Sequence, residues 1–444
     1  MIGETRSGLR ERIRKLVREY HERFPPRIPD SLVPVSGKIY GDEELVNLVD
    51  AALDGWWTDG RFGQEFSDAL SLYLGLKEVI LANSGSSANL VAFMTLTSPL
   101  LSKRRILPGD EVICTAAAFP TTVNPILQAG CVPVFVDVRL ETHNIDTTML
   151  EAALSPKTKA VFIAHTLGNP FDLAAVKAFC EQHGLWLIED CCDALGSQFD
   201  GRPVGTFGDL ATFSFYPAHQ ITTGEGGAVV TDNALLAKIA RSFRDWGRDC
   251  WCPTGKDNTC GARFNQQHGT LPFGYDHKYV YSHLGYNLKL TDFQAAIGVA
   301  QIKRLPSFVE RRKQNHAALS AFFTEKGFDR FFILPEHDER AKPSWFGFTL
   351  VIKDGAPFTR AELLAHLNKE GVQTRLVFAG NVTRQPYFVK SKYTYRVVGG
   401  LANTDKIMND AFWVGVYPGI DDSMIKRLCA SFESFLAAHK DAPR

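Results

Sequence analysis

The stretch AVFIAHTLGNPFDLAAVKAFCEQHGLWLIED (residues 160–190) contains the repeating unit that decides the fold. An apolar run, AVFIAHT, leads into a helix-like segment, DLAAVKAFCEQHG, and a second apolar run, LWLIED, follows directly. Such alternation predicts strand–helix–strand units whose strands lie parallel in one sheet. The same pattern extends in both directions along the chain, with further strands expected at EVIL (78–81), EVICT (111–115), VPVFVDV (132–138) and ATFSFY (211–216).

These units predict an α/β fold with a mostly parallel, doubly wound sheet, in which ligands bind beyond the carboxyl ends of the strands. After about residue 300 the pattern changes to a long charged helix, expected at roughly 300–326, followed by the apolar run WFGFTLVI. We therefore expect an N-terminal helical segment over residues 1–45, a large domain over 46–300 and a smaller C-terminal α/β domain over 301–444.

The composition narrows the possible partners and the compartment. Lys+Arg and Asp+Glu both count 49, and this zero net charge argues against a nucleic acid or an acidic membrane as partner. The N-terminal run is charged and unlike a signal peptide, and no apolar stretch is long enough to span a bilayer. Nine cysteines in such a chain favour free thiols or metal ligands in a reducing cytoplasm over a disulfide framework.

Two strand ends carry polar residues suited to an anionic or heterocyclic ligand. In LANSGSSANL (81–90) the small residues Gly85 and Ser86 open a helix, where free N–H groups suit a phosphate, although an ordinary capped helix looks the same. In LIEDCCDALGS (187–197) Asp190 ends a strand and could pair with a protonated ring nitrogen. A helix-capping aspartate explains that position equally well.

The segment SFYPAHQITTGEGGAVVT (214–231) joins a strand end, a polar loop with His219, a glycine-rich turn and a return strand. It resembles the sugar aminotransferase/dehydratase branch of the fold-type I pyridoxal-phosphate enzymes, whose corresponding loop carries a lysine that binds the cofactor covalently. Because imidazole cannot form that link, the resemblance implies pyridoxamine phosphate held non-covalently, with His219 as the catalytic base. The rival interpretation is a structural histidine in an inactive homologue.

Four cysteines share a compact pattern: after a gap of 57 residues, Cys192 is followed by Cys250-x-Cys252-x7-Cys260. The spacing alone leaves a [2Fe–2S] cluster, a zinc site and unrelated buried thiols open. Within the Lys-to-His dehydratases, the sequence is similar to the CDP-4-keto-6-deoxy-D-glucose 3-dehydrases of 3,6-dideoxyhexose biosynthesis, which carry a [2Fe–2S] cluster on this spacing. This implies that the four cysteines are ligands and that residues 248–264 form an iron–sulfur loop in the cofactor-binding domain.

The resemblance covers nearly the whole chain, including DGWWTDGRFG, FPTTVNP, YNLKLTDFQAA and FWVGVYPG. One departure is Gln220, where a second histidine is expected in this subgroup. The resemblance implies that Asp190 pairs with the pyridine nitrogen and that Asp193 lies near the cofactor. It further implies that Phe119 stacks on the ring, that the phosphate is held by Gly85, Ser86 and Ser214, and that Asn287 reaches the phosphate of the neighbouring subunit in a homodimer.

The implied function is dehydration and deoxygenation at C3 of a CDP-4-keto-6-deoxyhexose in dideoxysugar and O-antigen biosynthesis. A cluster must receive its electrons from elsewhere, so a separate NADH-dependent flavin and iron–sulfur reductase is expected. The open alternatives are a cluster-bearing dehydratase of a dTDP-4-keto-2,6-dideoxy sugar, a cluster-free GDP-sugar dehydratase and a non-catalytic iron–sulfur sensor. A DNA-binding regulator is disfavoured by the zero net charge and by the absence of a recognisable helix-turn-helix segment.

Overall fold

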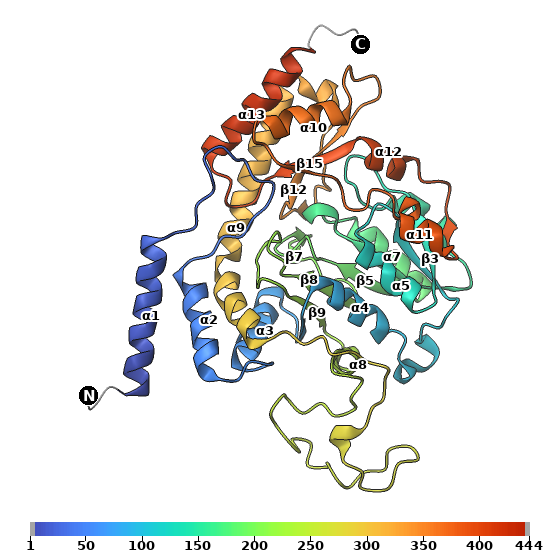
Figure 1. Ribbon diagram of the computed structural model, residues 1–444. Helices are drawn as coiled ribbons and strands as arrows, with labels where there is room; N and C mark the ends of the chain where they lie inside the picture. Colours follow the sequence, from blue (N-terminus) through green and yellow to red (C-terminus); the bar gives the residue numbers. More distant parts are fainter. Residues whose placement is uncertain (1–4, 440–444) are drawn as a thin grey trace.

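The computed structural model describes residues 5–439, and its centre is an eight-stranded sheet in the order β1-β9-β8-β5-β4-β2-β3-β14 (Figure 1). Only β9 runs antiparallel to its neighbours in this sheet, and the other adjacent pairs are parallel. The predicted α/β fold with a mostly parallel sheet is therefore confirmed. The strands are β1 (Glu78–Ala82), β2 (Glu111–Thr115), β3 (Val132–Val136), β4 (Thr158–Ala164), β5 (Trp186–Asp190), β8 (Leu210–Ser214), β9 (Gly227–Thr231) and β14 (Arg396–Val397).

Helices cover both faces of this sheet. Successive side chains of a strand point to opposite faces, so Val112 and Cys114 of β2 pack into one apolar core while Ile113 packs into the other. Both cores are buried, which explains why the strands read as continuous apolar runs. One face is covered by α4 (Gly85–Thr95), α5 (Pro120–Gln128) and α8 (Ala234–Arg244), and the other by α3 (Arg61–Leu74), α6 (Leu150–Ala153), α7 (Leu173–His183) and the first half of α9 (Asp292–Glu325).

The long helix α9 connects the large sheet to a smaller antiparallel sheet with the order β10-β12-β15-β13. The helix begins earlier than the expected residue 300, because Thr291 and Gln294 form a capping box at its start. The predicted domain boundary thus falls inside α9. The small sheet comprises β10 (Phe332–Ile333), β12 (Gly347–Ile352), β13 (Thr374–Arg375) and β15 (Ala411–Gly415), and its helices are α10 (Arg360–Lys369), α12 (Ala402–Asp410) and α13 (Asp422–Ala437).

Part of the C-terminal region returns to the large domain. After β13 the chain crosses to the large sheet, forms the short helix α11 (Pro386–Ser391) and adds β14 beside β3. A third small sheet links the two parts, since β11 (Ala341–Lys342) pairs with β6 (Gln198–Phe199), which pairs with β7 (Arg202–Pro203). The cavity described below therefore receives side chains from both parts.

Two segments lie outside this core. Helix α1 (Arg6–Arg23) packs along α2 (Asp42–Asp54), where Arg10 and Arg14 both pair with the Asp50 carboxylate. Between α8 and α9 the chain forms an extended loop, which projects away from the sheet (Figure 1) and contains the predicted iron–sulfur segment.

Among the described residues, no helix combines the length and the apolar character needed to cross a membrane.

Candidate active site

A cavity of about 630 Å³ lies at the carboxyl edge of the large sheet. Its position follows from the topology, because parallel strands end at the same edge and their following loops converge there. Its volume is within the usual range for a small-molecule site, about 300–1,000 Å³. Eight of the residues predicted from the sequence line it: Gly85, Ser86, Phe119, Asp190, Cys192, Asp193, Ser214 and His219.

Asp190 is the last residue of β5 and is almost fully buried. Its Oδ2 accepts hydrogen bonds from Asn89 Nδ2 at 2.9 Å and Thr122 Oγ1 at 2.7 Å, and its Oδ1 accepts one from the Cys192 backbone N–H at 3.1 Å. Asn89 is in turn fixed by a hydrogen bond from the hydroxyl of Thr212, at 2.6 Å. The carboxylate is therefore held in one orientation at the floor of the cavity.

The start of α4 forms a narrow cradle beside Asp190. Ser84 caps the helix by accepting a hydrogen bond from Ser87 N, so the first turn presents its N–H groups and positive end at the cavity. Only glycine fits at position 85, because a Cβ there would lie 2.4 Å from Ser214 Cβ and 2.9 Å from Cys192 Sγ. This combination of a tight glycine, a helix start and the Ser214 hydroxyl is suited to a phosphate.

His219 lies on the loop after β8, with its side chain 14% exposed. Its Nδ1 is 2.6 Å from the carbonyl oxygen of Cys192. Since a carbonyl can only accept, Nδ1 carries the hydrogen and Nε2 presents a lone pair. Burial lowers the pKa of His219 to about 4, so the imidazole is neutral and able to accept a proton at neutral pH.

Asp193 lies across from the imidazole, with Oδ1 3.9 Å from His219 Nε2. Burial, together with the nearby Asp190 carboxylate, raises the pKa of Asp193 to about 8. Gln220 is buried and points away from the cavity, donating from Nε2 to the carbonyl oxygens of Asp193 and Ser344. Its side chain therefore holds the backbone behind Asp193 and does not reach the cavity lining.

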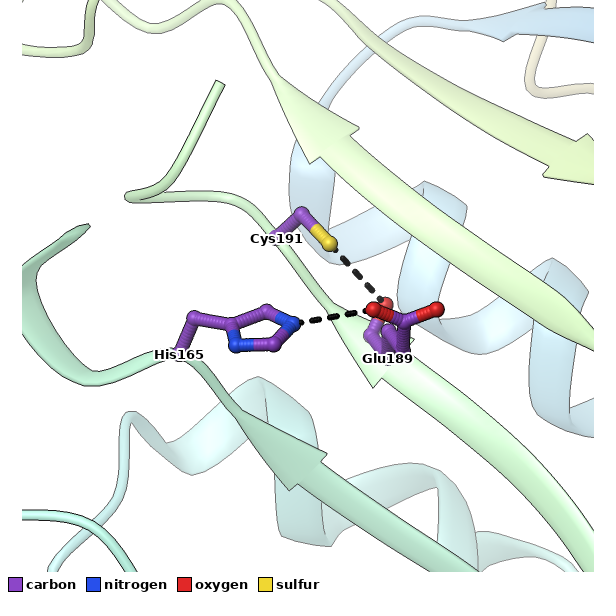
Figure 2. Close-up of side chains that lie close together, drawn as sticks. All are labelled: His165, Glu189 and Cys191. Atoms are coloured by element: carbon purple, nitrogen blue, oxygen red, sulfur yellow. Dashed lines mark hydrogen bonds and ion pairs between the residues drawn. The ribbon is translucent and has the colours of Figure 1, made fainter. Parts of the chain in front are cut away.

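A buried hydrogen-bond network surrounds Glu189, the residue before Asp190, and Figure 2 shows its contact with His165. Glu189 Oε2 accepts hydrogen bonds from His165 Nε2 at 3.1 Å and Gly205 N at 2.8 Å, and Oε1 accepts from Phe207 N and Gly208 N. His165 donates here because its Nδ1 accepts from the Phe171 backbone N–H. These hydrogen bonds lower the pKa of Glu189 despite its complete burial. The ionised carboxylate thus ties the ends of β4 and β5 to the turn before β8.

The mouth of the cavity combines residues from both sheets. Phe119 is half exposed, and its ring lies edge-on to that of Phe378, with centroids 6.3 Å apart. Phe346 and Trp413 of the smaller sheet complete an apolar wall, and Arg375 of β13 adds a positive charge. The mouth therefore offers both apolar and charged contacts to a ligand that extends beyond the floor.

Four predicted residues lie elsewhere. Asn287 is an exposed residue of the long loop, outside this cavity, where its Oδ1 accepts a hydrogen bond from Lys289 Nζ at 2.8 Å. The cysteines Cys250, Cys252 and Cys260 lie on the same loop, and the first two line a separate cavity of about 1,020 Å³. The role predicted for Asn287, at a neighbouring subunit, stays a prediction.

The four predicted cluster ligands are divided between two places. The Cys192 sulfur lies in the cavity beside Gly85, because Cys192 follows the end of β5 directly, whereas Cys191 is fully buried on the other side of the strand. On the loop, the Cys252 sulfur accepts a hydrogen bond from Thr259 Oγ1 at 3.0 Å. In the described part of the chain, no three of the four sulfur atoms lie within 4.8 Å of one another. The structure does not assemble the predicted cluster site.

The chain belongs to the DegT/DnrJ/EryC1/StrS aminotransferase family, which it matches over residues 39–433. It is 53% identical to the lipopolysaccharide biosynthesis protein RfbH of Salmonella typhimurium, over 97% of this chain and 99% of that protein. It is 46% identical to the dTDP-4-dehydro-2,6-dideoxy-D-glucose 3-dehydratase of Saccharopolyspora spinosa, over 96% and 92% of the two chains.

A solved structure shares both the fold and part of the sequence. The E. coli GDP-4-keto-6-deoxy-D-mannose-3-dehydratase with bound hydrated PLP aligns with a TM-score of 0.77 and 27% identity, covering 90% of this chain and 98% of that one. The fold is thus that of the PLP-dependent aminotransferases and dehydratases, as the sequence predicted.

Several residues of the site were not found from the sequence. Asn89 and Thr122 orient Asp190 through hydrogen bonds. A polar residue on the buried face of a helix usually has a specific partner, and this signal could have revealed Asn89. Arg312 is fully buried and donates to the carbonyl oxygens of His219 and Trp345. No sequence pattern marks Arg375 as a residue of the cavity, because its place there depends on how the small sheet packs.

Proposed function

We propose that this chain is a pyridoxamine-phosphate-dependent dehydratase that removes the C3 hydroxyl of a nucleotide-linked 4-keto-6-deoxyhexose. The observation that carries the proposal is His219. It lies in the cavity on the loop where the aminotransferases that the sequence resembles carry a lysine, and it presents a neutral Nε2 with a free lone pair. A base without the capacity for a covalent link favours proton transfer over transamination.

The residues present fit the cofactor. Asp190, held by three hydrogen bonds, can pair with a protonated ring nitrogen, and the cradle of Gly85 and Ser214 at the start of α4 can hold the phosphate. Phe119 at the mouth can cover one face of the ring. When bound, pyridoxamine phosphate supplies an amine that condenses with the sugar ketone and a conjugated ring that accepts electrons.

The protein contributes control of protons. His219 Nε2 can remove a proton at the cofactor's C4′ carbon, because the hydrogen bond from Nδ1 to the Cys192 carbonyl fixes both the tautomer and the ring orientation. The same nitrogen, once protonated, can deliver that proton to the departing C3 hydroxyl, which is otherwise a poor leaving group. The buried Glu189–His165 network keeps the strand end that carries Asp190 in place.

The relatives support the substrate class. One is named a dTDP-4-dehydro-2,6-dideoxy-D-glucose 3-dehydratase, another a lipopolysaccharide biosynthesis protein, and the solved structure is a GDP-4-keto-6-deoxy-D-mannose-3-dehydratase. The two named dehydratases share dehydration at C3 of a nucleotide sugar. We propose a CDP-linked substrate, on the resemblance stated from the sequence, with the dTDP-linked 2,6-dideoxy sugar as the alternative.

The remaining elements of the proposal rest on the family resemblance and, for the cluster, on the cysteine spacing. They are a [2Fe–2S] cluster on Cys192, Cys250, Cys252 and Cys260, a separate NADH-dependent flavin and iron–sulfur reductase, and a cytoplasmic homodimer in which Asn287 serves the partner's site. The spacing and the family resemblance support them. The sulfur atoms are not assembled in the structure. The steps assigned above to His219 and Asp190 use only these side chains and the cofactor, so they do not depend on the cluster.

The proposal is tested by asking how the cofactor is held and which sugar is turned over. After loading with pyridoxal phosphate and borohydride reduction, mass spectrometry should find no adduct on the 214–227 loop, whereas His219→Lys should gain one there. Turnover of CDP-, dTDP- and GDP-linked 4-keto sugars should then identify the nucleotide. A stoichiometric reduced adduct on any lysine of the parent enzyme, or turnover of none of the three sugars, would contradict the proposal.

A further inference from the structure

We infer that Arg375 binds the diphosphate of the nucleotide-sugar substrate and so fixes the direction in which the substrate enters the cavity. The inference rests on the proposed function, since it concerns the same cavity, and it names a residue that neither the sequence motifs nor the cofactor chemistry uses. It follows from the distribution of charge along the cavity wall, the state of the guanidinium and the rigidity of the segment that carries it.

The charges of the cavity are unevenly distributed. The carboxylates of Asp190 and Glu225 line it. Among the described residues that line it, Arg375 is the only lysine or arginine. The diphosphate of a nucleotide sugar carries about two negative charges, and binding it beside carboxylates requires a compensating cation. Within this cavity wall, Arg375 is the side chain that can supply it.

The guanidinium of Arg375 is available for a ligand. Arg375 is exposed, and its hydrogen bond in the described structure runs from Nη1 to the carbonyl oxygen of its neighbour Thr374, at 2.9 Å. Other arginines of the C-terminal region differ, since Arg384 pairs with the Asp405 carboxylate and Arg396 with that of Glu111. A planar guanidinium with free N–H groups is well suited to bidentate phosphate binding.

The segment that carries Arg375 is anchored at both ends. On one side, β13 pairs with β15, which places Arg375 opposite Trp413, and the Trp413 indole donates to the Leu376 carbonyl at 3.1 Å. On the other side, the backbone N–H of Val382 donates to the Ala116 carbonyl at 2.9 Å, just before Phe119. This bridge between the two sheets holds the backbone of Arg375 at the cavity wall, so the segment need not rearrange when an anion binds.

The cofactor phosphate is a weaker match for this arginine. The cradle of Gly85, Ser214 and the start of α4 lies at the end of β1 and β8, beside Asp190. Arg375 belongs to the other sheet, next to Leu376, which is about half exposed. A ligand whose sugar lies at the floor would therefore extend its diphosphate toward Arg375 and leave its nucleoside at the open end.

The test measures nucleotide binding to the pyridoxamine-phosphate-loaded enzyme by isothermal titration calorimetry. The probes are CDP, dTDP and GDP, with cytidine, thymidine and guanosine as ligands that lack phosphate. The variants are Arg375→Ala and Arg375→Lys, and Arg139→Gln, an exposed arginine outside the cavity, is the matched control. Cofactor retention after gel filtration is measured in parallel by absorbance.

For the diphosphate that the parent enzyme binds best, Arg375→Ala should raise the dissociation constant about tenfold to hundredfold, because a charge-assisted pair is lost. Arg375→Lys should recover part of that loss, and the control should match the parent. Binding of the nucleosides and retention of the cofactor should not change. In turnover, KM should rise with little change in kcat, as expected when the lost contact is made equally in the ground and transition states.

Two results would overturn the inference while leaving the proposed function intact. The first is equal diphosphate affinity in the parent and Arg375→Ala. The second is loss of the cofactor from Arg375→Ala, which would assign the arginine to the cofactor phosphate. If the parent binds none of the three diphosphates, the proposed function itself fails, and the inference fails with it.

Discussion

Replacing Glu189 with glutamine should destabilise the folded enzyme strongly, although the two side chains have nearly the same shape. The carboxylate is fully buried and accepts four hydrogen bonds, from His165 and from the backbone of Gly205, Phe207 and Gly208. Glutamine retains one acceptor oxygen and places an NH₂ group where the other was. Whichever way the amide is oriented, two N–H donors then face a donor instead of an acceptor.

The magnitude follows from those two lost hydrogen bonds. A hydrogen bond to a charged group contributes about 1.5–3 kcal/mol, so the free energy of unfolding should fall by about 3–6 kcal/mol. Loss of the network should also loosen the end of β5 and reduce the order of Asp190.

The assay is urea unfolding of the cofactor-loaded enzyme, followed by circular dichroism. Glu181→Gln is the matched control, because Glu181 has a side chain 67% exposed and pairs with Lys177 on the surface of α7. Such a pair contributes about 0–1 kcal/mol, so the control should unfold almost as the parent does. A loss below about 1 kcal/mol in Glu189→Gln, equal to that of the control, would refute the assignment of Glu189 as a structural clamp.

Three further predictions concern the cofactor, the base and the cysteines. Gly85→Ala should raise the dissociation constant of pyridoxamine phosphate at least about tenfold, because its Cβ would lie 2.4 Å from Ser214 Cβ. An unchanged dissociation constant would contradict the assignment of this cradle as the phosphate site. The dehydration rate should stay constant from neutral pH downward and fall only as the pH approaches about 4, because burial lowers the pKa of His219 and only its unprotonated form is a base. The rate is measured in stopped assays. A fall centred near pH 6.5 would instead indicate a solvated imidazole. Enzyme prepared without oxygen should contain about two irons and two sulfides per chain, with less iron in Cys250→Ser but not in Cys429→Ser, and zinc in place of iron would rule out the cluster.

The strand segments expected from the sequence were predictable because the signal for each strand is local. Apolar runs such as LWLIED are buried on both faces, and the residues that follow them converge at one edge for topological reasons. Asp190 was noted as a carboxylate at a strand end, and the family resemblance implied roles for Ser214 and His219; the structure places all three in one cavity. The start of α9 was predicted too late, because its capping residues precede the charged run that marked the helix.

What the sequence could not show are contacts between segments far apart in the chain. The bond from Asn89 to Asp190 joins residues about a hundred positions apart, and the arrival of Arg375 at the cavity depends on β13 pairing with β15. The four cysteines illustrate the opposite case. The family resemblance implied one site for them, whereas the structure places Cys192 in the cavity and the other three on the projecting loop.

The most direct test of the central claim is oxygen exchange at C3 of the sugar. The pyridoxamine-phosphate-loaded enzyme is incubated with its nucleotide-linked 4-keto-6-deoxyhexose in ¹⁸O-labelled water, without reductant, and label at C3 is measured by mass spectrometry. The parent should incorporate label, since elimination is reversible, and His219→Asn should incorporate none while retaining the cofactor. Incorporation at the parental rate in His219→Asn would contradict the assignment of His219 as the base.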